Sequence, residues 1–521
     1  MKILKQIYSE LIKDIYKVFI LFFFVKKVKN ANKKKLIIIN NQYHEDFSWV
    51  SYILGSLLKK KGYDVKFLIC GGNSYCERMT YTIEKPNCKI CHFSNILKLK
   101  SFGHEYIIPN QINKNNDFED FDKFLDNKFD NLNFEGNDYT TSFKTSYLHY
   151  FKGKLKSFES HIGILKKLFY TSIKTLSSTK EIINKYKPFK IITINGKNIQ
   201  TGILFRQAIN NNIDCYTWDV FNQGFKSMFS KNEIAHDQNI SNELWNTFKL
   251  EELSLLEKKK IKEYMYLQSK SLNTPFRYYD ENAIEEKKQI FDNLKLDPNK
   301  DTISIFPNTD WDSTNIGLDD AYKDPYDFIE KIVKFAHDNE NYNVIIRCHP
   351  AEKKVSFHQR SSRPIDQFIR EEYDHLIKKN LFLIEANSNI SSYTLAKISK
   401  HRIVYTSTLG LEFSYMKLKT LVAGKAFYKF RGFTKDITPF EDLEKILKSD
   451  YQNDLSEKEF SLLEKFIYIS KFRKLFNLDY FDNAKFKISS IKDFNKIFQN
   501  KTYCNIADYV LDKRNYLDLD K

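Results

Sequence analysis

The sequence lacks an apolar run long enough to cross a membrane as a helix. The run from Val18 to Val25 (VFILFFFV) has only eight residues, whereas a membrane-spanning helix needs about 20. No small-residue cleavage site follows this run, so we expect no secretory signal peptide. The chain is therefore expected to stay in the cytoplasm.

The sequence also lacks an Arg-rich arm, zinc-finger spacing and any RNP-like motif. Its net charge is nevertheless +17, a value that suits nucleic acid, acidic lipid or an anionic substrate. Without those motifs nucleic acid is the weakest of the three, and no nucleic-acid partner is expected. Hydrophobic residues make up 42% and charged residues 29% of the chain, which is typical of a globular protein with substantial cores.

Residues 1–30 have the pattern of an amphipathic helix. Apolar residues recur at helical spacing among lysines from Leu4 to Phe19, which suits a helix that lies in the membrane interface with its basic face toward anionic headgroups. A helix packed on the protein's own surface is the alternative. The first interpretation places the protein peripherally on the inner face of the cytoplasmic membrane.

Two α/β regions follow. KLIIIN, VKFLIC and KIITIN in the first region and TISIF, YNVIIR, LFLIEA, RIVYTS and TLVAG in the second are short apolar runs separated by helix-length segments. Continuous apolar strands of this kind predict parallel sheets covered on both faces. We therefore expect two Rossmann-like, doubly wound domains, at 31–290 and 300–445, with a helical insertion at about 107–187 and a helical tail at 446–521.

Polar loops in the second region follow the strands, where parallel sheets bind ligands. In YTSTLGLE, hydroxyls of Thr406, Ser407 and Thr408 precede a helix that Gly410 opens, and Glu412 falls in its first turn. This pattern predicts a phosphate site, with plain helix capping as the alternative.

The loop RCHPAE (Arg347 to Glu352) places His349, followed by Pro350, after a buried strand. An imidazole there can hold a leaving phosphate and donate a proton. Arg347, two residues earlier, should share its face. A structural loop without a ligand is the alternative.

These motifs together resemble the capsule polysaccharide biosynthesis family of glycosyltransferases, which includes the Kdo transferases of capsule assembly. The resemblance rests on NTDWD, R-x-HPAE, ISSYTL, YTSTLGLE and G-x-x-x-Y-x-x-x-GFT, in that order over about 140 residues from Asp301 to Phe440. It implies a GT-B-like fold, a nucleotide-sugar donor, CMP-linked in some relatives, and a glycan or lipid-linked acceptor.

The resemblance also implies roles for individual residues. His349 and Pro350 match the family's donor-phosphate motif, Ser407 and Thr408 match its hydroxyl pair, and Glu412 matches the acidic residue that follows. The donor-binding residues expected here are Arg347, Pro350, Glu352, Thr406, Ser407, Thr408, Gly410, Glu412, Asn308 and Asp312. In the first half INGKNIQTG matches the family pattern, but Asp219 and Gly224 lie further apart than expected, so no acceptor-site role is assigned to Asp219.

A cysteine cluster lies in the first region: Cys70, Cys76, Cys88 and Cys91. Four thiolates can close a tetrahedral zinc site or hold an iron–sulfur cluster, and a cytoplasmic chain favours metal over disulfides. A structural zinc and free or redox-active thiols remain alternatives. No cofactor is expected to be required for catalysis.

Transfer to an acceptor hydroxyl also requires a base. The first loop of the chain offers Asp46 and, as second choice, His44, although both can also be helix-capping residues. The sequence thus predicts a glycosyltransferase with His349 as a further catalytic residue. The alternatives are a nucleotide-sugar epimerase of the same architecture and a non-catalytic scaffold of polysaccharide assembly.

Overall fold

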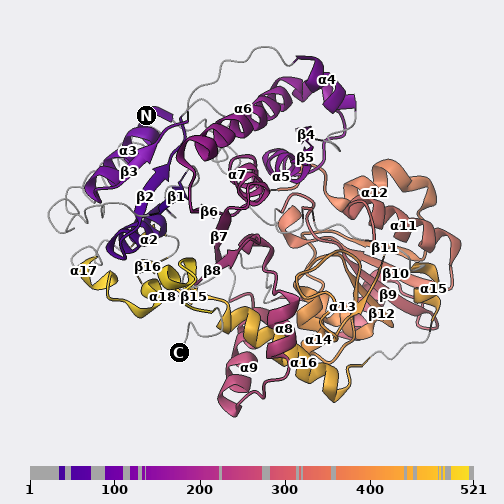
Figure 1. Ribbon diagram of the computed structural model, residues 1–521. Helices are drawn as coiled ribbons and strands as arrows, with labels where there is room; N and C mark the ends of the chain where they lie inside the picture. Colours follow the sequence, from indigo (N-terminus) through magenta and orange to yellow (C-terminus); the bar gives the residue numbers. More distant parts are fainter. Residues whose placement is uncertain are drawn as a thin grey trace, which may run out of the picture. The chain divides into compact units, whose positions relative to one another are not determined.

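The protein forms two compact units in a computed structural model, drawn in Figure 1. The first comprises Met1–Tyr147, Ser157–Gln238 and Arg473–Lys521, and the second comprises Leu148–Lys156 and Asn239–Phe472. The structure describes residues 35–41, 48–71, 88–109, 118–126, 132–134, 136–221, 226–272, 282–312, 316–317, 321–353, 360–438, 443–449, 454–478, 480–482, 485–486 and 494–515. The predicted amphipathic helix at 1–30 lies outside these residues.

The first unit is built on one mixed sheet. Its elements are β1 (Leu36–Asn40), α2 (Ser48–Lys60), β2 (Asp64–Leu68), α3 (Cys88–Ser101), β3 (Glu105–Ile107), α4 (Phe118–Asp126), β4 (Asn133–Phe134), β5 (Asn137–Asp138), α5 (Thr140–Phe151), α6 (Ile162–Tyr186), β6 (Lys190–Ile194), α7 (Ile199–Asn210), β7 (Asp214–Phe221), β8 (Lys226–Lys231), β15 (Phe476–Asn477), β16 (Phe481–Asp482), β17 (Lys485–Phe486), α17 (Phe494–Ile497) and α18 (Lys501–Val510). The end of α5 is grouped with the second unit.

The strand order of this sheet is β15-β8-β7-β6-β1-β2-β3. The strands β7, β6, β1, β2 and β3 run parallel, whereas β8 is antiparallel to β7 and β15 is antiparallel to β8. The parallel part has the strand order of a Rossmann-like sheet, which reverses direction between β1 and β6. The antiparallel strand β8, which forms a hairpin with β7, was not predicted.

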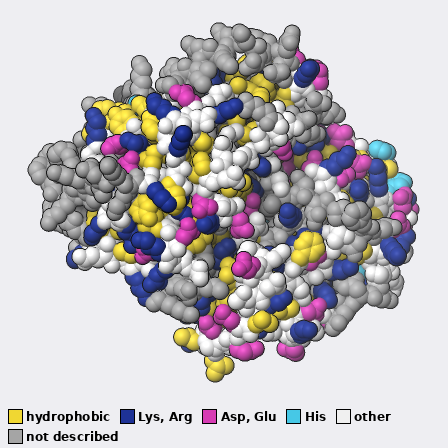
Figure 2. Space-filling view, in the orientation of Figure 1, with side chains coloured by type: hydrophobic (Ala, Val, Ile, Leu, Met, Phe, Trp, Pro, Cys, Tyr) yellow, Lys and Arg dark blue, Asp and Glu magenta, His cyan; other side chains and the backbone are white. Residues whose placement is uncertain are grey.

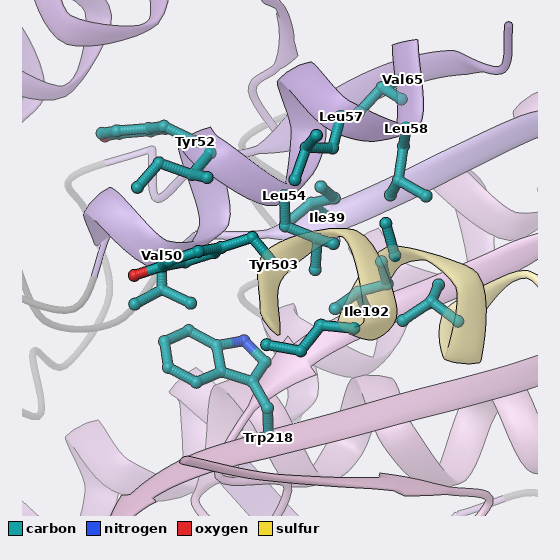
Figure 3. Close-up of a cluster of buried hydrophobic side chains, with 14 of the residues drawn as sticks. Ile39, Val50, Tyr52, Leu54, Leu57, Leu58, Val65, Ile192, Trp218 and Tyr503 are labelled. Carbon is teal, nitrogen blue, oxygen red and sulfur yellow. The ribbon is translucent and has the colours of Figure 1, made fainter. Parts of the chain in front are cut away.

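The core of the first unit joins segments that are far apart in the sequence. Figure 3 shows Tyr503 of the C-terminal helix α18 among side chains of α2 and the sheet, with Ile39, Ile192 and Trp218 close by. Helix α18 packs against α2. The chain after 472 therefore completes the first core, rather than forming the separate helical tail that was expected from 446 onward.

An ionic network reinforces this return of the chain. The buried ammonium group of Lys190, on β6, lies 2.5 Å from Asp512 and 3.2 Å from Asp214. Lys231 on β8 also pairs with Asp512, at 2.9 Å. Hydrogen bonds from these lysines and from Tyr216 outweigh the effect of burial and lower the pKa of Asp512 to about 2. The C-terminal segment is thus tied to three strands.

The second unit contains an all-parallel sheet. Its elements are α8 (Asn242–Phe248), α9 (Leu255–Ser269), α10 (Lys287–Leu294), β9 (Asp301–Phe306), α11 (Pro325–Asp338), β10 (Tyr342–Arg347), α12 (Ile365–Tyr373), β11 (Leu381–Ile384), α13 (Ser392–Ile398), β12 (His401–Val404), α14 (Leu409–Tyr415), β13 (Leu421–Val422), β14 (Lys435–Asp436), α15 (Leu443–Lys448), α16 (Glu457–Tyr468) and a π-helical turn (Ile469–Arg473). The strand order is β11-β10-β9-β12-β13-β14.

Local sequence accounts for several of these boundaries. Helix α11 begins with Pro325, and the side chain of Asp324 caps it by accepting the N–H of Asp327. Capping boxes open α9, through Ser254 and Glu257, and α16. The predicted α/β class with two Rossmann-like domains is confirmed, although the first sheet adds two antiparallel strands to its parallel part. The helices in the described part of the chain include none with the length and hydrophobicity of a membrane span.

Candidate functional site

The second unit contains a cavity of about 220 Å³ at the carboxyl ends of β10, β11 and β12. Four loop segments and the end of α9 form its wall. The lining residues are Gln268, Ser269, Ser271, Ala283, Glu285, Arg347, His349, Pro350, Ser388, Asn389, Ile390, Ser391, Ser392, Tyr393, Ser407, Thr408, Leu409 and Glu412. Six of the predicted site residues, from two separate motifs, therefore meet in one cavity: Arg347, His349, Pro350, Ser407, Thr408 and Glu412.

The loop after β12 presents the hydroxyls of Ser407 and Thr408 to this cavity. The Ser407 hydroxyl accepts the N–H of Leu409 at 3.2 Å, whereas the Thr408 side chain makes no capping bond and donates instead to Glu412 at 3.3 Å. Simple helix capping thus explains Ser407 in part and does not explain Thr408.

Glu412 forms part of the cavity wall and is held by the protein. One carboxylate oxygen accepts from the hydroxyl of Tyr393 and the other from Thr408. Burial raises the pKa of Glu412, although hydrogen bonds from Tyr393, Gln268 and Thr408 oppose that shift. Its carboxyl group therefore presents a fixed hydrogen-bonding surface to a ligand.

Gly410 serves packing rather than direct ligand contact. A Cβ atom at this position would lie 2.1 Å from the hydroxyl oxygen of Tyr428. That hydroxyl donates to the backbone carbonyl of Ser407. The small residue therefore lets Tyr428 fix the loop that carries Ser407 and Thr408.

Arg347 braces the cavity through backbone groups. Its guanidinium donates to the carbonyls of Glu385 and Ser388, the latter at 3.0 Å. These bonds hold the loop after β11, which contributes Ser388 to the cavity wall. The Nε atom of Arg347 is buried and has no hydrogen-bond partner among the described residues.

His349 lines the cavity as a neutral ring. Burial lowers its pKa to about 4. Its Nδ1 atom accepts the N–H of Ala351 at 3.1 Å, so the neutral ring carries its proton on Nε2. The side chain can therefore donate a hydrogen bond at neutral pH without adding a charge.

Glu352 lies away from the cavity. Its Oε1 accepts the N–H of Ile365 at the start of α12, at 3.1 Å. A carboxylate oxygen of Glu352, the Sγ atom of Cys348 and a carboxylate oxygen of Asp366 lie within 4.8 Å of one another. Lys353 pairs with Asp366 at 2.8 Å. Burial raises the pKa of Glu352 to about 8. Lys353 also pairs with Glu385 at 3.2 Å, and we assign this cluster a bracing role for the loop that carries His349.

The described residues 307–312 of the loop after β9 lie beside the cavity and are not among its lining residues. Asn308 donates to Thr406 at 3.4 Å, and the charge of Asp312 acts on both His349 and Lys152. Lys152 lies over the Trp311 ring, 4.7 Å from its centroid. Thr406, Asn308 and Asp312, which were predicted to bind the donor, therefore support the wall residues in this structure.

Several predicted residues lie outside the described part of the chain. His44, Asp46 and Cys76 are among them, as is the side chain of Cys88. Cys70 and Cys91 are described and are partly buried. The zinc site and the two candidate bases in the first loop therefore remain predictions.

Two parts of the cavity wall were missed by sequence reasoning. Gln268 and Ser269 belong to α9, which was interpreted as part of a linker between domains. Their signal is weak because α9 is charged and its polar wall residues come only in its last turn. Tyr393 was visible within the ISSYTL motif, but its contact with Glu412 depends on the packing of α13 against α14.

A Rossmann-like sheet with a polar pocket at its strand ends defines a class of ligand-binding α/β unit. Residues 226–472, just under half of the chain, match the model of the family described as "Capsule polysaccharide biosynthesis protein". The family predicted from the motifs is thereby confirmed over these residues, which include the whole cavity wall. Among curated proteins none matches the chain.

The solved structures that the chain matches include Kdo transferases and UDP-GlcNAc 2-epimerases. The beta Kdo 2,4 transferase of Thermosulfurimonas dismutans KpsC is 11% identical, with a TM-score of 0.37 over 60% of this chain and 87% of that one. The beta Kdo 2,7 transferase of the same KpsC is 13% identical, with a TM-score of 0.34 over 66% and 98%. The UDP-GlcNAc 2-epimerase of Neisseria meningitidis is 10% identical, with a TM-score of 0.21 over 92% and 98%.

Proposed function

We propose that the protein is a glycosyltransferase of capsule or surface polysaccharide assembly. One observation carries this proposal: His349, Ser407 and Thr408, which come from two separate strand ends, line a single cavity of the second unit. Parallel α/β sheets bind their ligands at this edge. The match of residues 226–472 to a capsule biosynthesis family supports the same assignment.

The cavity suits the phosphate of a nucleotide-activated sugar. The Nε2–H of His349 and the hydroxyl of Ser407 are the donors we assign to its oxygens. The Thr408 hydroxyl, which donates to Glu412 at 3.3 Å, would turn its hydrogen to the phosphate when the ligand binds. When the bond to the sugar breaks, the phosphate gains negative charge, so these hydrogen bonds strengthen toward the transition state. Because His349 is neutral at pH 7, its main contribution is a hydrogen bond rather than a standing charge.

The charge of the cavity wall favours a donor with a single phosphate. Among the lining residues that the structure describes, Arg347 is the one lysine or arginine, and much of its guanidinium is bonded to backbone carbonyls. Glu285 and Glu412 are also in the wall. A diphosphate brings more negative charge against these groups than a monophosphate does. We therefore propose a CMP-linked sugar as the donor.

A transfer assay tests the proposed activity. The full chain would be incubated with CMP-, UDP- and GDP-sugars and oligosaccharide primers, and products would be measured by mass spectrometry. We expect a primer extended by one sugar with one class of donor. An altered sugar that is still attached to its nucleotide would instead identify an epimerase, and no product with any donor would identify a scaffold.

We also propose that the protein works at an anionic membrane surface, where a lipid-linked acceptor would be found. The described residues contribute a surface for this on α9. Leu255 is 88% exposed, Leu256 63% and Tyr266 62%, and the exposed Lys259 and Lys262 lie on the same helical face. Figure 2 shows hydrophobic and charged side chains together where Figure 1 draws α9. This arrangement suits anionic lipid rather than nucleic acid.

Vesicle sedimentation tests the membrane proposal. Replacing Lys259 and Lys262 by Glu should weaken binding to phosphatidylserine-containing vesicles by about fivefold or more per lysine. Ile209→Glu, a charge introduced at a side chain that is 36% exposed in the first unit, is the matched control. Unchanged sedimentation of the lysine variant would remove α9 from the membrane contact.

A further inference from the structure

Residues 282–285 of the second unit are attached to the loop that follows β11. Ile284 forms a parallel bridge with Ile390. Its N–H donates to the carbonyl of Asn389 at 2.9 Å, and its carbonyl accepts the N–H of Ser391 at 3.2 Å. This short segment is therefore fixed to the wall of the cavity, although it precedes the first strand of the unit in sequence.

Glu285 is the charged residue of this segment, and it lines the cavity. Its backbone carbonyl accepts the hydroxyl of Thr394, on α13, at 3.1 Å. The side chain is exposed, and its carboxylate makes no hydrogen bond or ion pair within the described part of the chain. The backbone of Glu285 is thus held in place while its carboxylate can accept hydrogen bonds from a ligand.

Glu285 and the phosphate donors lie at the ends of different strands. In the sheet, β11 is next to β10, and β9 lies between β10 and β12. His349 follows β10 and Ser407 follows β12, so a phosphate that contacts both lies over the end of β9. Glu285, attached to the loop after β11, is two strand spacings away, about 10 Å. This separation is comparable to that between the phosphate and the base of an extended nucleotide.

The two ends of the cavity offer opposite hydrogen-bonding groups. At one end, the ring of His349 and the hydroxyl of Ser407 can donate to an anion. At the other end, the carboxylate of Glu285 can only accept hydrogen bonds, and its charge repels a phosphate. A nucleotide is therefore oriented with its phosphate toward Ser407 and with a hydrogen-bond donor toward Glu285.

Apolar residues lie beside Glu285 in the cavity wall. Ala283 belongs to the same segment, and Ile390 belongs to the loop to which that segment is attached. Ligand cavities of this kind combine apolar surfaces with a few polar groups that fix the orientation of the ligand. A planar base can pack on Ala283 and Ile390 while its hydrogen-bonding edge faces the carboxylate.

We propose that Glu285 selects the base of the nucleotide by accepting a hydrogen bond from the exocyclic amino group of cytosine. This inference rests on the function proposed above and assigns a specificity-determining residue to it. Carboxylates accept hydrogen bonds from the same amino group in protein–DNA complexes. Uracil carries a carbonyl oxygen at this position, so it places an acceptor against an acceptor and binds less tightly.

Binding of CMP and UMP to the full chain tests this selection without any sugar transfer. Titration calorimetry would measure both Kd values for the wild-type protein and for Glu285→Gln. The wild-type protein should bind CMP more tightly than UMP, by about fivefold or more. In Glu285→Gln the two Kd values should become nearly equal, because an amide can accept from the amino group of cytosine or donate to the carbonyl of uracil.

Glu286→Gln is the matched control. Glu286 is the next residue in the chain and is also exposed, but it is not among the residues that line the cavity. Its substitution therefore removes the same charge nearby without removing the proposed contact, and the preference for CMP should stay as in the wild-type protein. Melting temperatures without nucleotide would confirm that both variants are folded.

Three results would overturn the inference, and they are distinguishable from failure of the proposed function. Equal binding of CMP and UMP by the wild-type protein, or a preference for CMP that Glu285→Gln leaves unchanged, contradicts selection by Glu285. Equal weakening of both nucleotides in that variant shows that the carboxylate contacts the ribose instead of the base. A wild-type protein that binds no nucleotide contradicts the proposed function and, with it, this inference.

Discussion

The two sheets share a strand order but carry opposite kinds of histidine at their carboxyl edges. In the second unit burial dominates, and the pKa of His349 falls to about 4. In the first unit the carboxylate of Asp219 dominates, and the pKa of His236 rises. One imidazole is a neutral hydrogen-bond donor, and the other lies beside a carboxylate that favours its protonated form.

The same strand order thus supports different side-chain arrangements at the carboxyl edges of the two sheets. The second unit uses parallel strand ends and a wall that the protein itself holds rigid. The first unit adds an antiparallel strand, whose return brings a histidine to an aspartate. Substitutions in the second unit should leave the His236–Asp219 pair intact.

The largest expected effect comes from His349→Ala. Removing the Nε2–H donor should lower kcat by about 10²- to 10⁴-fold, because the leaving phosphate loses a hydrogen bond that strengthens as the bond breaks. The measurement is the transfer assay, with circular dichroism to confirm the fold. His375→Ala, an exposed histidine of the same unit, should retain full activity. Wild-type turnover in His349→Ala would remove His349 from the mechanism.

The sequence predicted the second unit well for physical reasons. Its strands are continuous apolar runs, and Arg347, His349, Ser407 and Thr408 lie in short motifs directly after them. Local sequence therefore determines both the strand and the side chains that follow it. The cavity could be predicted because strand ends of a parallel sheet share one edge.

The parts of the structure that could not be predicted from the sequence depend on contacts between segments that are far apart in the chain. Nothing near Asp219 in sequence indicates that His236 will return to it, and nothing after 472 indicates that α18 completes the first core. The boundary at Asn239 also arises from packing, because α9 and α16 contact each other and α14. Long-range contacts of this kind leave no periodic signal in a single sequence.

A second prediction concerns the rigidity of the cavity wall. Gly410→Ala places a Cβ atom against the hydroxyl of Tyr428, 2.1 Å away without relaxation. We expect the free energy of unfolding to fall by about 1–3 kcal/mol, as for overpacking elsewhere, and nucleotide binding to weaken. Denaturant unfolding measures the first effect.

Tyr428→Phe provides the matched test of this cause. Removing the hydroxyl relieves the shortest contact with the new methyl group, although the ring carbon Cζ still lies 2.7 Å from it without relaxation. The double variant should therefore be more stable than the sum of the two single changes predicts. Strict additivity of the two changes would contradict the proposed contact. The titration of His236 should be unchanged in all three variants.

A third prediction concerns a pH dependence that Glu352 confers on stability. Burial raises the pKa of Glu352 to about 8, whereas in an unfolded chain a glutamic acid ionises near pH 4.3, roughly. The folded protein holds this proton more tightly. The stabilisation is therefore fully present below pH 4.3 and is lost as pH rises toward 8, by up to about 1.4 kcal/mol per pH unit.

Glu352→Gln should remove this slope. The variant keeps an oxygen to accept the N–H of Ile365 but cannot ionise. Denaturant unfolding at pH 5.5, 6.5 and 7.5, as chosen conditions, should show wild type losing stability relative to Glu352→Gln as pH rises. Parallel curves for the two proteins would show that Glu352 does not hold a proton in the folded state.

Nucleotide binding by the second unit is the central claim, and thermal unfolding of the full chain with CMP, UDP and GDP tests it most directly. We predict that CMP raises the melting temperature, with a stabilisation of about 2.7 kcal/mol at 100 times its Kd. His349→Ala and Ser407→Ala should reduce that shift, and His236→Gln should not. A melting temperature that none of the three nucleotides changes would contradict the account.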